Sequence, residues 1–175
     1  MRALCEECAQ GQVLVPANFN CPGQIVIAGE PAAVARAEEA WAQAGKRSSR
    51  LATSGAFHSP LMAEAAEALA AYLEGVEFSE PRVPLICNVE AAPLDVADAR
   101  ERLVRHLTSP VRFDQSVAAL RAAGADTFVE VGFGGVLANL VKRIDKTASR
   151  ACVQDRASFE AYLAEDGAAA ATDPE

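Results

Sequence analysis

Residues 127–144 read TFVEVGFGGVLANLVKRI, and this stretch decides the fold class. Its first five residues are a short run of β-branched and aromatic side chains, which favours a buried strand over 127–131. The glycine-rich segment 132–135 predicts a turn, and the apolar spacing after it predicts a helix over 136–144. A phosphate cradle is the alternative for this turn, but no Gly-Lys-Ser/Thr follows and the dinucleotide pattern is incomplete, so a strand-to-helix turn is favoured.

The segments before this stretch show the same alternation of strands and helices. Val83–Val89 is a strand candidate that begins between two prolines, and an alanine-rich amphipathic helix is expected over 60–72. Aspartates that can cap helices predict two more, over 95–107 and 114–123. Strands that alternate with helices indicate an α/β protein with a parallel sheet.

The first fifty residues have their own pattern, α-β-β-α-β. The tight-turn sequence NFNCPG at 18–23 separates two strand candidates, and Pro31 fits the first position of a helix closed by Gly45. This order matches a small split βαβ layout without its opening strand. The expected elements are a helix over 2–9, strands over 13–20 and 24–29, a helix over 31–44 and a third strand over 47–53.

The overall charge excludes several classes of partner. The 175 residues carry a formal net charge of −8 at pH 7, which argues against nucleic acid and against a polybasic membrane surface. No apolar run approaches the ~18 residues of a membrane span, and Met1–Gln12 lacks the apolar core of a secretory signal, so the expected location is cytoplasmic. Residues 167–175 are rich in alanine, aspartate and proline without periodicity, and we expect disorder there.

The five cysteines have no regular spacing. Cys5 and Cys8 form a C-x-x-C, but there is no second pair and no nearby histidine. Two small residues on one helix face are therefore favoured over a metal or redox site, and no metal is expected.

The segment that carries candidate chemistry is GAFHSPLM at 55–62. His58, one of two histidines, stands where a loop is expected to enter a helix, a suitable place for a general base that serves a nucleophile. Taken alone, a histidine before Ser-Pro is more often a surface or capping residue. No Gly-x-Ser-x-Gly elbow occurs, and Ser54, Ser59 and Ser109 lie outside any elbow context. The chain therefore reads as one half of an active site.

Four segments in a characteristic order extend across roughly residues 1–146. They are NFNCPGQ at 18–24, GAFHSPLM at 55–62, LTSPVRF at 107–113, and EVG at 130–132 with KRI at 142–144. In their order and spacing the chain resembles the C-terminal half of the malonyl-CoA:acyl carrier protein transacylases, and more broadly the acyltransferase domains of fatty acid and polyketide synthases.

This resemblance implies an α/β-hydrolase-like core that carries a ferredoxin-like insert. Residues 1–53 would be most of the ferredoxin-like subdomain, without its opening strand. Residues 54–150 would be the C-terminal part of the acyltransferase core, and residues 151–175 a C-terminal extension.

The resemblance also implies a ping-pong reaction of fatty acid biosynthesis, in which a serine takes malonyl from malonyl-CoA and passes it to the pantetheine thiol of acyl carrier protein. His58 would be the general base, a role typically worth ~10²–10⁴-fold in rate. A backbone carbonyl at the position of His106, where the family often has glutamine, would orient it. The His106 ring itself is expected to be a helix-end cation that suits the helix dipole. No cofactor is implied beyond the two substrates.

Three further residues have roles implied by the resemblance or by position. Phe57 indicates malonyl specificity, because a phenyl ring fills the space that an α-methyl branch needs, and one methyl is worth about 1–3 kcal/mol. Lys142 and Arg143 are cations at an expected helix end, where they suit the dipole. Docking of acyl carrier protein or of coenzyme A phosphates is their alternative role.

The chain also departs from the family pattern. Cys21 stands where serine is frequent, and Phe133 and Gly135 replace the proline and lysine of a Gly-Pro-Gly-Lys turn. The elbow serine, the arginine that pairs the malonyl carboxylate and the oxyanion loop have no counterpart, so we expect an inactive chain that needs a missing N-terminal half. The alternatives are a non-catalytic remnant or scaffold that binds acyl carrier protein, and a hydrolase whose nucleophile comes from another chain. Unpaired sheet edges and apolar faces are expected to make the isolated chain marginal or aggregation-prone.

Overall fold

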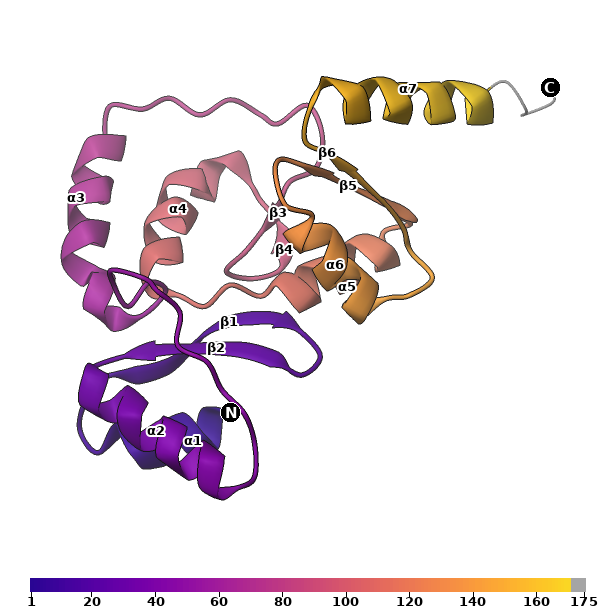
Figure 1. The fold of residues 1–175 in the computed structure, drawn as a ribbon. Coiled ribbons are helices and arrows are strands. Elements are labelled where there is room, and N and C mark those ends of the chain that lie inside the picture. Colours follow the sequence, from indigo (N-terminus) through magenta and orange to yellow (C-terminus); the bar gives the residue numbers. More distant parts are fainter. Residues whose placement is uncertain (171–175) are drawn as a thin grey trace. The chain divides into compact units, whose positions relative to one another are not determined.

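The computed structural model describes residues 1–170 and divides into two compact units, Met1–Ser116 and the residues from Val117 onward. Both units contain helices and strands, so the predicted α/β class is confirmed (Figure 1). Within residues 1–170, every helix is too short or too polar to cross a membrane. Of the predicted disordered tail, residues 171–175 lie outside the described residues, and residues 167–170 continue a helix.

The first unit opens with an antiparallel hairpin and two helices. Strand β1 (Leu14–Cys21) pairs with β2 (Gln24–Gly29) around the predicted tight turn. Helices α1 (Arg2–Ala9) and α2 (Pro31–Gln43) pack on the strands and on each other, and all four elements match the predicted ranges to within one residue (Figure 1). Their common core consists of Cys5, Cys8, Leu14, Ala33 and Ala37, which places the C-x-x-C on a buried helix face as expected.

Gly29 ends the hairpin where two backbone segments meet closely. Glu30 N donates a hydrogen bond of 2.8 Å to the Val13 carbonyl, and a Cβ on Gly29 would lie 2.2 Å from that same oxygen. Only glycine fits this contact, because the obstacle is backbone and cannot rotate away.

The third strand predicted over 47–53 is wrong. These residues are exposed and irregular, and Arg50 is held by a bidentate contact with Glu38 of α2 instead of by a strand ladder. A strand needs a neighbour to accept its backbone hydrogen bonds. None of the strands in residues 1–170 pairs with this segment, so the observed order is α-β-β-α.

The rest of the first unit carries the histidine loop on a pair of packed helices. The helix predicted over 60–72 is a short 3₁₀ turn followed by a regular helix, and the helices predicted over 95–107 and 114–123 are present. The elements are η1 (Pro60–Met62), α3 (Ala63–Leu73), η2 (Val96–Asp98) and α4 (Ala99–Thr108), and α5 (Phe113–Ala122) begins in this unit and ends in the second.

The strand predicted over 83–89 is largely wrong. Only β3 (Ile86–Cys87) forms a ladder, antiparallel to β4 (Ala92–Pro93). The chain reverses at once, because Ala91 adopts φ 55° and its N–H donates to the Cys87 carbonyl at 2.8 Å. Residues 88–91 are therefore a turn.

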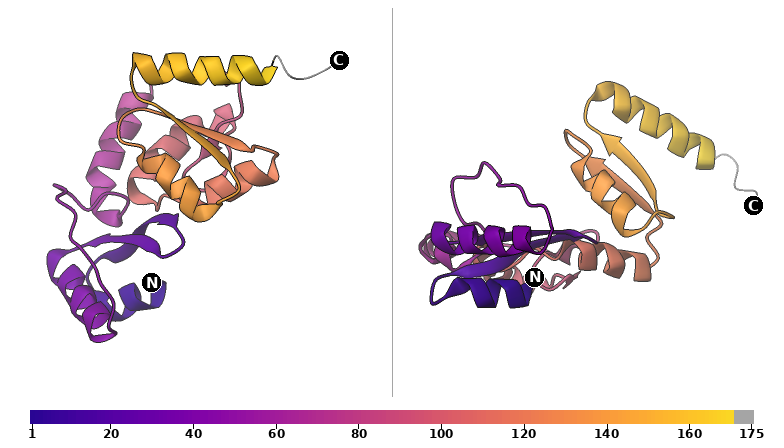
Figure 2. Two further views of the ribbon diagram at one scale, coloured as in Figure 1. Left: turned by 45° about the vertical axis from the view of Figure 1, so that its right-hand side comes forward. Right: turned by 60° about the horizontal axis from the view of Figure 1, so that its bottom comes forward.

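The second unit is a βαβ motif followed by a helix. Strands β5 (Thr127–Val131) and β6 (Ser149–Val153) are parallel, with Thr127 opposite Ser149, and α6 (Val136–Ile144) connects them. The predicted ranges of β5 and α6 are confirmed. Of the strand pairs in residues 1–170, β5–β6 is parallel, whereas β1–β2 and β3–β4 are antiparallel, so the expected parallel sheet is present only as this pair. Helix α7 (Arg156–Ala170) follows β6, and α6 and α7 lie on opposite sides of the strand pair (Figures 1 and 2).

The predicted burial of β5 is wrong, because none of its five residues is buried, and three elements, β4, β6 and α7, escaped prediction. Val131 is 83% exposed, because only one strand flanks β5 in the part of the chain that the structure describes. Strand β6 has the sequence SRACV, whose short mixed composition shows no strand period, so its pairing with β5 was not foreseen. Helix α7 has no marked apolar stripe and was not foreseen either.

Candidate active site

The loop before η1 presents His58 in an unusual backbone conformation. His58 has φ 61°, a left-handed value that non-glycine residues adopt rarely and that is found preferentially at functional sites. The next residue holds the loop in place: Ser59 is fully buried, its Oγ donates to the Ala56 carbonyl at 2.6 Å and accepts from Leu61 N at 3.3 Å. Its hydroxyl serves the turn, so Ser59 is not a surrogate nucleophile.

His58 is hydrogen-bonded to the end of α4. Its Nδ1 lies 2.9 Å from the carbonyl oxygen of His106, in the last turn of that helix. The last four carbonyls of a helix have no partner within it, so this oxygen is available as an acceptor. A carbonyl only accepts, so the proton must be on Nδ1, and the neutral ring then has its lone pair on Nε2. This is the tautomer that a general base requires.

The two imidazole rings are also close to each other. Their centroids are 4.9 Å apart and their planes are tilted by 38°. Burial, and secondarily the charge of His58, lowers the pKa of His106 below its usual 6.5, and its Nε2 is buried with no hydrogen-bond partner. The role of His106 as a helix-end cation stays a prediction, and burial works against it because burial opposes the charged form of the ring.

Phe57 precedes the histidine and remains accessible. Its side chain is 47% exposed, and a Cβ on Gly55 would lie 3.7 Å from its ring, so the ring folds over the loop. The specificity role of Phe57 stays a prediction.

The structure also places the two other serines considered as nucleophiles. Ser109 is the C-cap residue of α4, and Ser54 is exposed in the irregular loop.

The glycine turn of the second unit is a structural turn. The carboxylate of Glu130 accepts a hydrogen bond of 2.8 Å from Ala138 N, and Gly134 N donates to Gln154. The Glu130 carboxylate thus occupies the place at the start of α6 where a bound phosphate would accept hydrogen bonds. This supports the prediction of a strand-to-helix turn over that of a phosphate cradle. Lys142 and Arg143 are exposed in the last turn of this helix.

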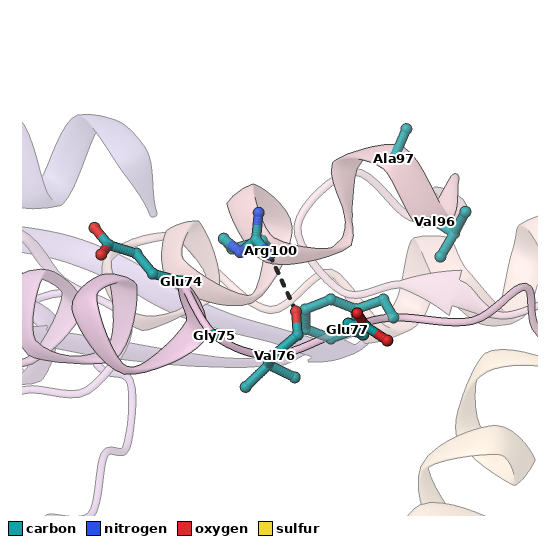
Figure 3. A pocket seen from close by; sticks show the side chains of 8 residues that line it. Glu74, Gly75, Val76, Glu77, Val96, Ala97 and Arg100 are labelled. Carbon is teal, nitrogen blue, oxygen red and sulfur yellow. Dashed lines mark hydrogen bonds between the residues drawn. The ribbon is translucent and has the colours of Figure 1, made fainter.

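A hollow of about 630 Å³ lies between the end of α3 and the start of α4 (Figure 3). Its one cation, Arg100, donates to the carbonyls of Leu73 (2.8 Å) and Val76 (3.0 Å) and so caps the end of α3. No lining residue belongs to the histidine pair. With its guanidinium used in this way, the hollow offers no charged group for a ligand beyond two glutamates.

Sequence reasoning missed one cluster next to the histidine pair. Glu90, in the turn between β3 and β4, contacts Arg102 and Arg105 of α4. The i,i+4 ion pairs within α4 can be recognised from the spacing of their residues in the sequence. No such spacing rule links Glu90 to α4, which begins nine residues later.

Two comparisons of sequence identify relatives. The family described as acyl transferase domain matches residues 2–162. The malonyl CoA-acyl carrier protein transacylase of Salmonella typhimurium is 44% identical over 161 residues, which are 91% of this chain and 52% of that protein. The protein of the same name from Bacillus subtilis is 42% identical over 153 residues, covering 86% of this chain and 48% of its own length.

Solved structures give the same result. The MCAT of Streptococcus pneumoniae superposes with a TM-score of 0.89 at 42% identity, over 94% of this chain and 54% of that one. A malonyl-transacylase solved in complex with a type II PKS acyl-carrier protein superposes with a TM-score of 0.90 at 44% identity. The match covers 94% of this chain and 54% of that one. The chain spans about half the length of the curated relatives it matches. Because the family match covers most of its residues, the chain belongs to the acyl transferase domain family.

Proposed function

We propose that this chain supplies the general-base part of a malonyl-CoA:acyl carrier protein S-malonyltransferase of fatty acid biosynthesis. The observation that carries the proposal is the 2.9 Å contact between His58 Nδ1 and the His106 carbonyl, which leaves Nε2 as the basic nitrogen. The names of the curated relatives support malonyl-CoA and acyl carrier protein as the two substrates.

In the first half-reaction, His58 Nε2 takes the proton of a serine hydroxyl as its oxygen attacks the thioester carbonyl of malonyl-CoA. The coenzyme A sulfur leaves and takes that proton from the imidazolium. In the second half-reaction, the pantetheine thiol of acyl carrier protein gives its proton to His58 and attacks the acyl-serine ester. The serine oxygen then leaves and recovers the proton. The serine lies outside this chain, which by itself would be inactive.

Three further assignments belong to this proposal. The Phe57 ring beside the base would exclude an α-methyl branch and so select malonyl. The exposed cations Lys142 and Arg143 would contact acyl carrier protein or coenzyme A phosphates. No cofactor takes part in the mechanism, and the cytoplasmic location stays a prediction.

The finer fold assignment is also a proposal. We infer that residues 1–53 belong to a ferredoxin-like subdomain, residues 54–150 to an α/β-hydrolase-like core and residues 151–175 to a C-terminal extension. The α-β-β-α order with an antiparallel hairpin supports the first assignment, and the strand–turn–helix unit β5–α6 supports the second.

A chimera tests the proposal. This chain replaces the 161 matching residues of the Salmonella typhimurium relative, and malonyl transfer from malonyl-CoA to acyl carrier protein is measured. We expect transfer by the chimera, and its loss by about 10²–10⁴-fold in the His58→Ala variant.

His106→Gln is the matched control, because it keeps the backbone carbonyl, and its rate should stay within a few-fold of the parent. Unchanged transfer by His58→Ala would remove His58 from its role. An inactive chimera, with binding of acyl carrier protein by the chain alone, would favour the remnant or scaffold instead.

A further inference from the structure

Glu90 is a carboxylate held against the helix that carries His106. Its two oxygens are buried and contact the guanidinium groups of Arg102 and of Arg105, the latter at 2.9 Å. Burial opposes the charged form, but hydrogen bonds from Arg102 and Cys87 and the charges of both arginines outweigh it, so the pKa of Glu90 lies below its usual value. The contacts with Arg102 and Arg105 therefore tie the ionised Glu90 carboxylate to two successive turns of α4.

The turn that carries Glu90 also holds the chain on the other side of His106. The carbonyl of Asn88 accepts from Arg112 N at 3.0 Å, and Val111 N donates to the Ala17 carbonyl of β1 at 2.9 Å. His106 thus lies between two anchors, at 102–105 and at 111–112, and residues 88–90 take part in both.

We infer that Glu90 is a positioning residue for His58, acting through the last turn of α4. The His106 carbonyl lies one residue beyond Arg105, and its oxygen holds His58 Nδ1 at 2.9 Å. A hydrogen bond weakens steeply with distance and angle, so a displacement of ~1 Å in this turn breaks the contact. The catalytic consequence rests on the proposed function, but the positioning itself does not.

Nuclear magnetic resonance of the 175-residue chain tests this directly, because only two histidines contribute to the spectrum. With ¹⁵N-labelled histidine, the nitrogen shifts report which ring nitrogen of His58 carries the proton. Nuclear Overhauser effects between the two rings, whose centroids are 4.9 Å apart, report their packing. Neither readout requires acyl transfer.

The variants are Glu90→Gln, which keeps the shape and removes the charge, and Glu90→Asp as the conservative rescue. Glu38→Gln is the matched control, because Glu38 also uses both of its oxygens to bind arginine, in its case Arg50 alone and from α2. We expect Glu90→Gln to lower the Nδ1–H population of His58 at least about twofold and to weaken the ring-to-ring effects. Glu90→Asp should recover part of both, and Glu38→Gln should change neither.

The inference is overturned if a folded Glu90→Gln variant shows the same His58 nitrogen shifts and the same ring-to-ring effects as Glu38→Gln. If Glu90→Gln does not fold, Arg105→Gln decides, because it keeps the Glu90–Arg102 contact: a smaller change in the same direction supports the inference, and no change overturns it. A His58→Ala chimera that still transfers malonyl would defeat the proposed function, whereas a changed His58 tautomer in Glu90→Gln would still support the positioning role.

Discussion

The hairpin segment (α1–β1–β2–α2) and the βαβ segment (β5–α6–β6) bury their apolar side chains to different degrees. In the hairpin segment, Cys5, Leu14, Ala33 and Ala37 are each at most 5% exposed and form one cluster. In the βαβ segment Leu140 and Val141 are buried, but Val131, Phe133, Val136 and Leu137 are exposed.

The difference follows from the two kinds of sheet. An antiparallel hairpin can be covered on one face and solvated on the other, so two helices are enough to enclose its core. A parallel pair is stable when both faces are covered and its edges are paired. The hairpin segment therefore encloses one apolar cluster with its own two helices, and its strand β1 also bonds to Val111. The βαβ segment instead leaves apolar surface of the kind that marks a contact with further polypeptide.

The largest expected effect is at Gly29 of the hairpin segment. Gly29→Ala places a Cβ against the Val13 carbonyl and should destabilise the chain by about 3 kcal/mol, because backbone cannot yield. Urea unfolding followed by the fluorescence of Trp41, the single tryptophan, measures this. Gly75→Ala is the control, since nothing lies within 4 Å of its Cβ, and an equal loss in both variants would contradict the clash.

The two units are expected to lose stability in different ranges of pH. In the first unit, burial lowers the pKa of His106, so the unfolded chain binds this proton more readily than the folded chain. The free energy of unfolding should then fall as pH decreases below about 6.5. His106→Gln should reduce this loss between pH 7.5 and 5.5, measured by urea midpoints, and an unchanged pH dependence would show that the ring does not contribute.

The second unit should respond to acid in a lower range. Hydrogen bonds from the hydroxyl and the backbone of Thr147, and then Arg121, lower the pKa of Asp145 from 3.8 to about 2. The stabilisation is present above pH ~4 and is lost as pH falls toward 2. Asp145→Asn should remove this step, measured as pepsin cleavage within residues 117–170 at pH 4 and pH 2.5. Equal cleavage of variant and parent at both pH values would contradict the assignment.

The smallest effect on stability is expected at the exposed apolar side chains of the βαβ segment. Val131→Thr with Phe133→Ser should change the free energy of unfolding by no more than about 0.5 kcal/mol, because both side chains are over 80% exposed. Self-association, measured by light scattering, should decrease. Tyr72→Ser, an exposed aromatic of α3, is the control, and unchanged association in the double variant would place the contact surface elsewhere.

Local patterns accounted for much of the fold and for one half of the site. The hairpin turn, Pro31 at a helix start and the β5–turn–α6 unit were predictable because each depends on neighbours in the sequence. The strand over 47–53 failed because its residues have strand character but no partner in the described chain. Strand β6 escaped because its pairing with β5, and not its composition, makes it a strand.

The sequence was enough to point to His58 and to the position of His106, whose carbonyl the structure places against the His58 ring, whereas the role of Phe57 stays a prediction. Tertiary structure alone brought the His58 ring to a carbonyl 48 residues away, placed the His106 ring 4.9 Å from the His58 ring, and set Glu90 against Arg102 and Arg105. The physical reason is range. Turn and helix preferences act over a few residues, whereas a 2.9 Å hydrogen bond between distant segments depends on how the helices that carry them pack.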